Sequence, residues 1–207
     1  MCPYPSSWAD ADGGPILLDV AHNPHELPAD LPAPVDDGAC QHLVGTALPH
    51  LRLESTAGTW LNTSSLAAGR SVVFVYPKTG IPGVEPPSGW DRIPGARGCT
   101  PQTCAYRDDY SAFQQLGVEV FGLSAQTNSE QREFAEREHV PFPLLSDPAL
   151  ELAAALHLPT FVVEDLVLYR RVTLVVNSGR IVYVRYPVFP PDSDADATLA
   201  WLRAERA

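Results

Sequence analysis

The sequence predicts an α/β fold in which helices cover both faces of a mixed central sheet. Two observations carry this prediction. Residues 71–76 form a continuous apolar, β-branched run of the kind that forms a buried strand, and 118–124 indicate a second one; segments with helical spacing lie between and after these strands. With 207 residues, 45% of them hydrophobic, the chain is long enough for one domain with a full core and an extension.

The first part of the chain predicts an extension followed by the start of the sheet. Residues 1–40 are rich in proline, aspartate and alanine with weak periodicity, so we expect an N-terminal extension and a folded domain at 41–207. The runs LPHLRLES and GTWLN predict a hairpin around residues 56–58. Ser71–Tyr76 predicts a central strand that Pro77 ends, and the proline- and glycine-rich stretch 80–98 predicts a long loop.

The remaining elements follow in an alternating order. Apolar residues at three- and four-residue spacing predict a helix from about Pro101 to Leu116, and Gly117 ends it. The next segments predict a strand at 118–124, a helix from 128 or 129 to about 139, a strand in FPLLSD and a helix from 147 to 157. After these, RVTLVV and RIVYVRY predict two strands joined by a tight turn at 177–179, and a final helix is expected from 192 or 194 to 206.

This order of elements is the thioredoxin-like pattern. Strands that are joined through helices are expected to pair in parallel, because a parallel connection needs a long crossover. The last two strands, joined by a short turn, are expected to pair antiparallel. The prediction is therefore a thioredoxin-like fold with a mixed sheet.

Composition excludes several classes of function. The chain has 14 Lys and Arg against 25 Asp and Glu, a formal net charge of −11, so it offers no basic surface for nucleic acid or for an anionic membrane. No basic segment followed by an apolar run marks a signal peptide, and no run approaches the ~18 apolar residues of a membrane span. Four cysteines in a chain of this length favour reduced thiols, catalysis or metal binding over a disulfide scaffold, and we expect a reducing compartment such as the cytoplasm.

Two of the four cysteines lie close together at the start of a predicted helix. Cys99 follows Gly98, and orphan N–H groups and the dipole at a helix N-terminus stabilise a thiolate there. Cys104 lies five residues on, and in an intact helix this spacing separates the Cα atoms by about 8–9 Å. Since a disulfide needs less than about 7 Å, the spacing describes either an unpaired couple or a pair that bonds when the first turn unwinds.

Other interpretations of the cysteines stay open at this point. Cys99 and Cys104 are also compatible with two small buried residues at a crowded helix start, because free cysteine is often buried. Zinc is a weaker alternative, since the remaining candidate ligands are Cys2, Cys40 and the pair His22 and His25, with no second paired-cysteine spacing. We expect no catalytic role for Cys2 or Cys40.

A set of motifs carries a resemblance to a known family. The segments are VVFVYPKTG, GCTPQTCAYRDDYSAFQQLGVEVFGLSAQ, FPLLSD, RRVTLVVNSGRIVYV and LAWLRA. In this order, from about Leu43 to Ala204, they resemble the peroxiredoxins, and specifically the peroxiredoxin Q or bacterioferritin-comigratory subgroup. The core of the likeness is a strand ending in YPK, followed by GCT-x-x-x-C-x-x-RD.

The resemblance implies an activity and roles for named residues. It implies a thioredoxin-fold peroxidase that reduces hydrogen peroxide and organic hydroperoxides without a cofactor or metal. Cys99 matches the peroxidatic cysteine, Cys104 the resolving cysteine of the same helix, and Arg171, rather than Arg170, the arginine that pairs with the thiolate. A dithiol reductant such as thioredoxin would restore both thiols, and we expect a monomer. The alternative is a thioredoxin-like disulfide oxidoreductase without peroxidase activity.

The chain departs from the family pattern before Cys99. Where the family has a proline and a threonine seven and three positions earlier, this sequence has Arg92 and Ala96. Thr79 is therefore the candidate for the hydroxyl that supports the thiolate, with Thr100 as the alternative. The loop 80–98, with Trp90, and Phe189 from the other side are expected to form an apolar pocket at this site.

Overall fold

The computed structural model describes residues 23–205. Its strands are β1 (Arg52–Ser55), β2 (Trp60–Asn62), β3 (Arg70–Val75), β4 (Val118–Ser124), β5 (Leu144–Ser146), β6 (Thr160–Val163), β7 (Leu166–Tyr169), β8 (Val172–Asn177) and β9 (Arg180–Arg185). Its α-helices are α1 (Cys99–Asp108), α2 (Tyr110–Gln115), α3 (Asn128–Arg137), α4 (Glu151–Leu156) and α5 (Asp194–Ala204), and short 3-10 helices are η1 (Thr63–Ala68), η2 (Trp90–Arg92) and η3 (Pro191–Ser193). Within this range no helix has the length and apolar character needed to cross a membrane.

Seven strands form one mixed sheet in the order β2-β1-β5-β4-β3-β8-β9. Strands β3, β4 and β5, which are connected through helices, pair in parallel, and β8 pairs antiparallel with both β3 and β9. The predicted thioredoxin-like architecture and its strand directions are therefore confirmed. Strands β6 and β7 form a separate two-stranded sheet.

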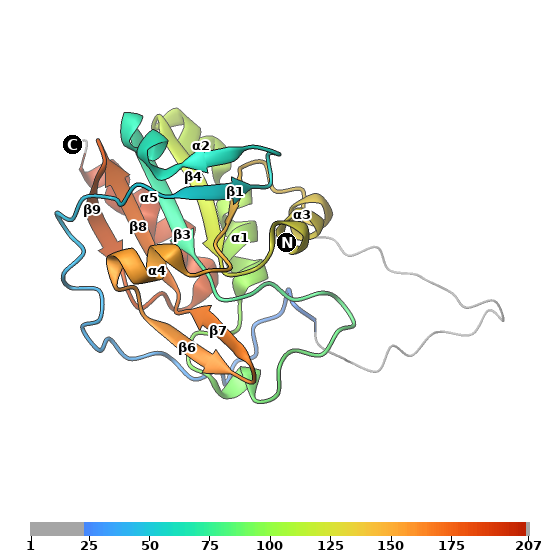
Figure 1. Cartoon of the computed structure of the whole chain (residues 1–207). Helices are drawn as coiled ribbons and strands as arrows, with labels where there is room; N and C mark the ends of the chain where they lie inside the picture. The colour runs from blue at the N-terminus through green and yellow to red at the C-terminus, as the bar shows by residue number, and fades with distance from the viewer. Residues whose placement is uncertain (1–22, 206–207) are drawn as a thin grey trace.

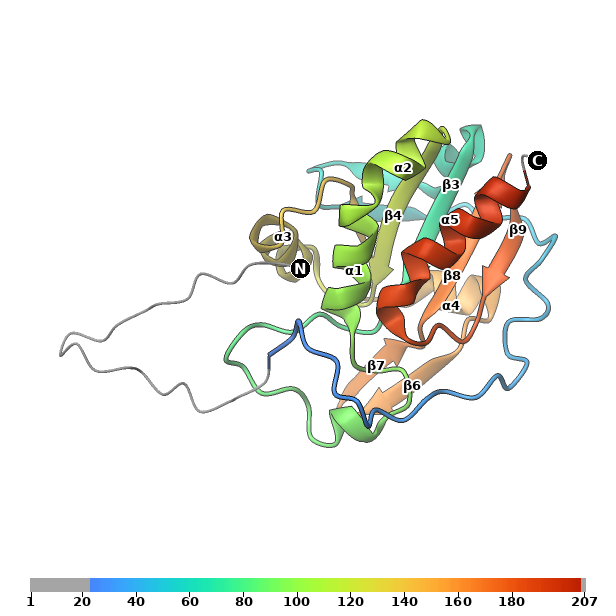
Figure 2. The same ribbon diagram turned by 180° about the vertical axis from the view of Figure 1, so that it is seen from behind.

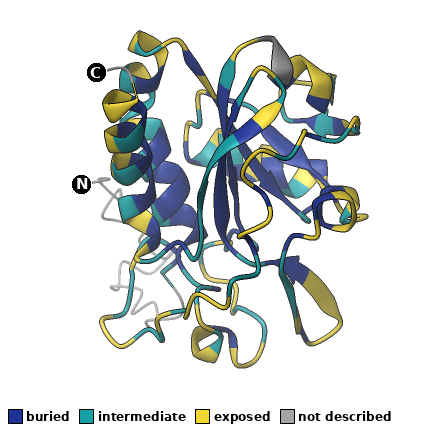
Figure 3. Cartoon of the chain, turned by 90° about the vertical axis from the view of Figure 1, so that its left-hand side faces the viewer, coloured by how far each residue is buried: buried dark blue, intermediate teal, exposed yellow. Residues whose placement is uncertain are grey.

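Helices cover both faces of the sheet, and each face has its own core. Helices α1, α2 and α5 lie on one face (Figure 2), and α4 lies on the other (Figure 1). The first core contains Phe74, Tyr106 and Leu199, and the second contains Val73, Leu152 and Leu174. Because β3 has apolar side chains on both faces, it is buried along almost its whole length, as are its neighbours in Figure 3.

The helix predicted over residues 101–116 is in fact two helices. It begins earlier, at Cys99, and it is interrupted at Asp109, where α1 ends and α2 begins. The apolar residues that predicted one helix pack in the same core on both sides of this break: Tyr106, Tyr110, Phe113 and Leu116. The apolar spacing therefore continues across the break at Asp109, so a spacing argument does not detect it.

Sequence analysis missed the hairpin of β6 and β7. Its strands are apolar, but its two turn residues are Glu164, with φ of 50°, and Asp165, in place of the glycine or asparagine that marks such a turn. The predicted helix at 147–157 is also shorter than expected, since α4 begins at Glu151. The carboxylate of Asp147 nevertheless accepts from the backbone N–H groups of Glu151 and Leu152, so it caps the helix from outside.

The described part of the extension packs around the loop that leads into α1. Residues 23–51 contain no helix or strand apart from an isolated bridge between Ala47 and Arg180. We call residues 23–34 the arm; Figure 2 shows it passing below the start of α1. The backbone carbonyl of Asn23 in the arm accepts from Arg97 at 3.1 Å. The domain boundary at residue 40 stays a prediction.

Gly98, the N-cap of α1, shows how tightly the arm and helix meet. Its φ is 101°, and a Cβ at this position would lie 2.8 Å from a methyl group of Leu27 in the arm and 2.3 Å from Pro191 of η3. Only a residue without a side chain combines this backbone conformation with this close approach.

We predict that Gly98→Ala lowers the free energy of unfolding by about 2 kcal/mol or more, because it adds a steric clash to an unfavourable backbone conformation. Gly83→Ala is the matched control, since Gly83 has φ of 74° but a Cβ added there would meet no atom within 4 Å. Urea unfolding of both variants measures the difference. Equal losses would mean that the contacts with Leu27 and Pro191 do not constrain Gly98.

Candidate active site

Cys99 is the first residue of α1, as its position after Gly98 predicted. Its side chain is buried, with 3% of its surface exposed, and its Sγ lies 3.7 Å from the carbonyl oxygen of Ala96. At this position the unpaired N–H groups of the first turn and the helix dipole favour negative charge on the sulfur. The location therefore suits a thiol that reacts as a thiolate.

Arg171, which immediately precedes β8, lies against Cys99. Its Nη2 is 3.3 Å from Sγ and also donates to the carbonyl oxygens of residues 95–97 at 3.2–3.3 Å. The side chain is 3% exposed, and among the described residues no carboxylate forms an ion pair with it. A buried cation without a carboxylate partner is costly, and the sulfur of Cys99 is the atom against this guanidinium at which negative charge would be balanced. Arg170, by contrast, is only half-buried.

Gln102 fixes the other side of this guanidinium. Its Oε1 accepts from Nη1 of Arg171, and its Nε2 donates to Oδ2 of Asp194 at 2.7 Å. The same Oδ2 accepts from Thr173 at 2.6 Å and Tyr106 at 3.0 Å. Burial raises the pKa of Asp194, and its hydrogen bonds with Thr173 and Gln102 act in the opposite direction. Sequence analysis missed this network because Gln102 and Asp194 are 92 residues apart.

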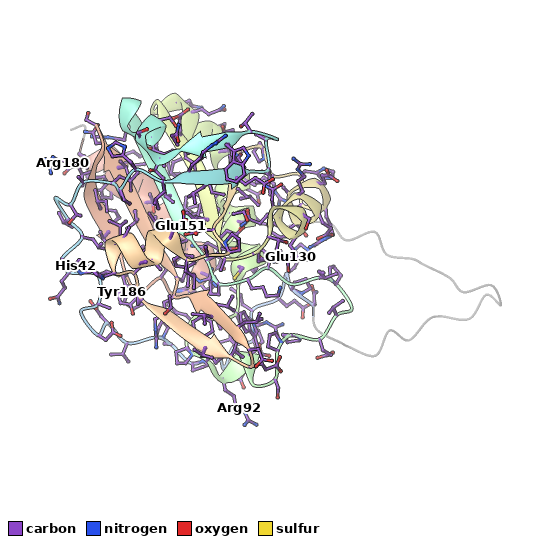
Figure 4. All side chains as sticks on the ribbon, viewed as in Figure 1. His42, Arg92, Glu130, Glu151, Arg180 and Tyr186 are labelled. Carbon is purple, nitrogen blue, oxygen red and sulfur yellow. The ribbon has the colours of Figure 1, made fainter. Side chains whose placement is uncertain are left out.

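Cys99 faces a pocket of about 380 Å³. One side comes from the loop after β3 and the other from the start of α1 and α3; the lining includes Pro24, Lys78, Thr79, Ile81, Val84, Pro86, Pro87, Trp90, Arg97, Thr100, Gln126 and Glu130. Figure 4 labels Glu130 on α3 and Arg92, which points away into solvent. Trp90 lines the pocket as predicted, but Phe189 is not among its lining residues, so that prediction was wrong.

Both candidate threonines line the pocket with Cys99. The hydroxyl and the backbone N–H of Thr79 donate to Oε1 of Gln126, at 3.0 and 2.8 Å, so this side chain is held by Gln126. The hydroxyl of Thr100 is buried, and it has no hydrogen-bond partner among the described residues. Thr79 is therefore oriented by a residue that sequence analysis did not single out, whereas Thr100 has unused hydrogen-bonding capacity beside Cys99.

Cys104 lies further along α1 and faces a different set of residues. It is buried, and its Sγ lies 3.8 Å from Oε2 of Glu138, which follows α3. Cys99 and Cys104 are separate thiols in this structure. Of the residues described, His25, Cys104 and Glu138 place possible metal-ligand atoms within 4.8 Å of one another. Two arginines against Glu138, Arg107 and Arg137, supply positive charge that opposes a bound cation.

The remaining cysteines are placed apart from this site or outside the described range. Cys40 belongs to the core on the α4 face of the sheet, whereas Cys99 belongs to the core on the opposite face. Burial, with the nearby carboxylates of Asp37 and Asp36, raises the pKa of Cys40 to about 12. Cys2 and His22 lie outside the described residues.

Comparison with known proteins agrees with this fold and site. A model of the redoxin family matches residues 43–199. Peroxiredoxin bcp1 from Schizosaccharomyces pombe is 33% identical over 132 residues, which cover 62% of this chain and 60% of that protein. The chloroplastic peroxiredoxin Q of Populus jackii is 31% identical over 161 residues, covering 77% of this chain and 68% of that protein.

A solved structure gives the same result. The crystal structure of peroxidoxin BcpB from Mycobacterium tuberculosis superposes with a TM-score of 0.65 at 27% identity, covering 79% of this chain and 98% of that one. The fold and the cysteine at the start of α1 define the class of protein: a thioredoxin-fold protein with a thiol at the N-terminus of a helix. Within that class the chain belongs to the redoxin family, and the two relatives reported above are a peroxiredoxin bcp1 and a peroxiredoxin Q.

We predict that Gln102→Ala slows alkylation of Cys99 by iodoacetamide about tenfold at neutral pH, because Arg171 loses the group that holds it against the sulfur. Gln114→Ala, at an exposed position on α2, is the control and is expected to leave the rate unchanged. Mass spectrometry of the peptide that contains Cys99 measures the rate. An unchanged rate in Gln102→Ala would show that the remaining contacts hold Arg171 in place.

We also predict that Cys40 resists iodoacetamide in the folded protein at mildly alkaline pH. Its raised pKa keeps the thiol protonated there, and the protonated thiol is a poor nucleophile. The same cysteine should react readily after unfolding in concentrated urea. Rapid modification of Cys40 in the folded protein would contradict the burial described above.

Proposed function

We propose that this protein is a thiol peroxidase that reduces hydrogen peroxide and organic hydroperoxides, with Cys99 as the peroxidatic and Cys104 as the resolving cysteine. The observation that carries the proposal is the contact between Sγ of Cys99 and the buried guanidinium of Arg171, at the N-terminus of α1 and at the wall of a pocket. The guanidinium and the helix N-terminus favour a reactive thiolate, and the pocket gives a small oxidant access to it; these observations support the proposal.

In the first step the thiolate of Cys99 attacks the terminal oxygen of the hydroperoxide. The O–O bond breaks, Cys99 becomes a sulfenic acid, and water or an alcohol leaves after taking up a proton. Positive charge on Arg171 stabilises the charge that develops on the leaving oxygen. The hydroxyl of Thr100 is a suitable second donor, since it is buried at the pocket without a partner among the described residues.

In the second step Cys104 condenses with the sulfenic acid to form a disulfide. Because both residues lie in α1, five positions apart, the first turn of the helix has to open. Its composition supports this: Gly98 precedes it, and threonines occupy positions 100 and 103, which are modest helix formers. Tyr106, stacked on Phe74 with ring centroids 4.3 Å apart, anchors the rest of the helix.

The pocket is large and apolar enough to accommodate hydroperoxides of different sizes. Its apolar side chains from the loop after β3, among them Ile81 and Val84, suit an alkyl group, and its volume of about 380 Å³ exceeds what hydrogen peroxide needs. A dithiol reductant such as thioredoxin would return the disulfide to two thiols. This part of the proposal rests on the family resemblance of the sequence motifs and on no contact in the chain itself.

The test follows the fluorescence of Trp90, which shares the pocket with Cys99, after mixing the reduced protein with equimolar hydrogen peroxide. We expect a fast change that Cys99→Ser abolishes. Cys104→Ser should keep the fast change but lose the disulfide, and under excess peroxide Cys99 should over-oxidise to the sulfinic acid. Mass spectrometry identifies each product.

Two outcomes would overturn the proposal. Absence of thiol consumption by peroxide, together with reduction of protein disulfides, would favour a disulfide oxidoreductase instead. Sustained turnover of Cys104→Ser with thioredoxin would assign resolution to another thiol. Cys40→Ser is the control for that case and should keep full turnover, because Cys40 lies in the core on the other face of the sheet.

A further inference from the structure

The thiol of Cys104 faces a buried carboxylate that the steps above do not use. Oε2 of Glu138 lies 3.8 Å from Sγ, within the range of a hydrogen bond from a thiol. Glu138 directly follows α3, and its side chain is only 6% exposed. On its other oxygen, Oε1, it meets Nε2 of His25 in the arm at 3.2 Å. Three segments far apart in the sequence therefore converge on one carboxylate.

Two arginines hold the carboxylate of Glu138 in position. Nη1 of Arg137 contacts Oε1, and Nη1 of Arg107 donates to the backbone oxygen of Glu138 at 2.6 Å and lies 3.9 Å from Oε2. Burying a carboxylate is costly unless it is paired in this way. Both guanidinium groups have a second carboxylate, since Arg137 also bonds Glu133 and Arg107 also bonds Asp108.

The ion pairs of Glu138 with the two arginines do not explain why a thiol lies against its carboxylate. The two arginines would balance Glu138 equally well with an apolar residue at position 104, yet the oxygen that is farther from Arg137 is the one directed at Sγ. A thiol attacks a sulfenic acid only as thiolate, so the resolving cysteine has to lose a proton before or during the step. A carboxylate in contact with that thiol is placed to accept it.

We propose that Glu138 is the general base of the resolving step and that His25 passes the proton from Glu138 to solvent. The inference rests on the proposed function, because it assigns Cys104 as the resolving cysteine. His25 is suited to the second transfer, since its side chain is 22% exposed while that of Glu138 is 6% exposed. Glu138 touches the reacting thiol, whereas His25 acts through Glu138 and is a positioning and relay residue.

The step balances as follows. The proton of the Cys104 thiol moves to Glu138, and the resulting thiolate attacks Sγ of the Cys99 sulfenic acid. The S–S bond forms as the S–O bond breaks, so the sulfur of Cys104 is oxidised and that of Cys99 is reduced. The leaving hydroxide takes up a proton from solvent and becomes water. Glu138 passes its proton to His25, which releases it to solvent, so the net product is one water molecule.

The geometry is compatible with the opening of α1. Cys104 is the sixth residue of α1, beyond the first turn, so opening that turn displaces Cys99 and leaves Cys104 beside Glu138. The arm contacts both regions, because Asn23 bonds Arg97 before Cys99 and His25 bonds Glu138 beside Cys104. This gives the described end of the extension a function in the reaction.

The experiment separates two phases in stopped-flow fluorescence after mixing with hydrogen peroxide: oxidation of Cys99, then formation of the disulfide. In Glu138→Gln we expect the second phase to slow about 100-fold and the first to persist, because loss of a general base costs about that factor. In His25→Gln the second phase should slow less, about tenfold. Glu136→Gln, at an exposed position on α3, is the control and should change neither phase.

The pH profile separates a chemical role from a structural one. If Glu138 removes the proton, the rate of the second phase in Glu138→Gln should rise about tenfold for each unit by which the pH is raised, because hydroxide then ionises the thiol of Cys104 directly. The groups that face Glu138 are His25 from the arm, Cys104 and Arg107 from α1, and Arg137 from α3.

The outcomes distinguish the two proposals. Absence of both phases in the unaltered protein would overturn the proposed function. A normal first phase with an unchanged second phase in Glu138→Gln, or a slowed one that no pH restores, would overturn the inference alone. Should Glu138→Gln fail to fold, as thermal unfolding would reveal, His25→Gln decides: a second phase equal to that of the unaltered protein overturns the relay.

Discussion

The buried guanidinium of Arg171 is the constraint on which the site depends. It spans from the sulfur of Cys99 to the carbonyl oxygens of residues 95–97 and to Gln102, and none of these partners is a carboxylate. A cation in such surroundings is stable only if the acceptors remain in place. The loop before α1 and the start of α1 are therefore held to the end of the central sheet by one side chain.

That constraint extends through Gln102 to α5, the neighbouring helix on the same face of the sheet. Asp194, the first residue of α5, accepts from Gln102, Thr173 and Tyr106, so α1, β8 and α5 share one buried carboxylate. Nε of Arg185 lies 3.6 Å from its other oxygen. The orientation of Arg171 is thus determined by the packing of the helices on this face. A polar network of this kind is stable only when its members are satisfied together.

The two cysteines of α1 have contrasting surroundings. Cys99 lies next to a cation that forms no ion pair with a carboxylate of residues 23–205, whereas Cys104 lies next to a carboxylate that already has cationic partners. In the proposed function, the first environment suits the thiolate that attacks the hydroperoxide, and the second suits a thiol that gives its proton to Glu138. One short helix therefore carries two sulfurs in contrasting electrostatic surroundings, and the arm contacts the region of each.

The sequence by itself determined the fold class, most of the strands and the position of Cys99 at a helix start. These features follow from local patterns: apolar runs at 71–76 and 118–124, and a glycine before the cysteine. The family motifs also pointed to Arg171. Local patterns did not reveal the break at Asp109 or the hairpin of β6 and β7, because the first preserves helical spacing and the second lacks the usual turn residues.

Only the tertiary structure decided what surrounds each functional side chain. Gln102, Gln126 and Glu138 bear on the site through contacts with residues 34 to 92 positions away, and nothing in their own neighbourhoods marks them. The same holds for His25, which meets Glu138 across the folded surface. Hydrogen bonds and charge contacts depend on distance in space, which a linear pattern does not encode, whereas strand and helix preferences depend on neighbours along the chain.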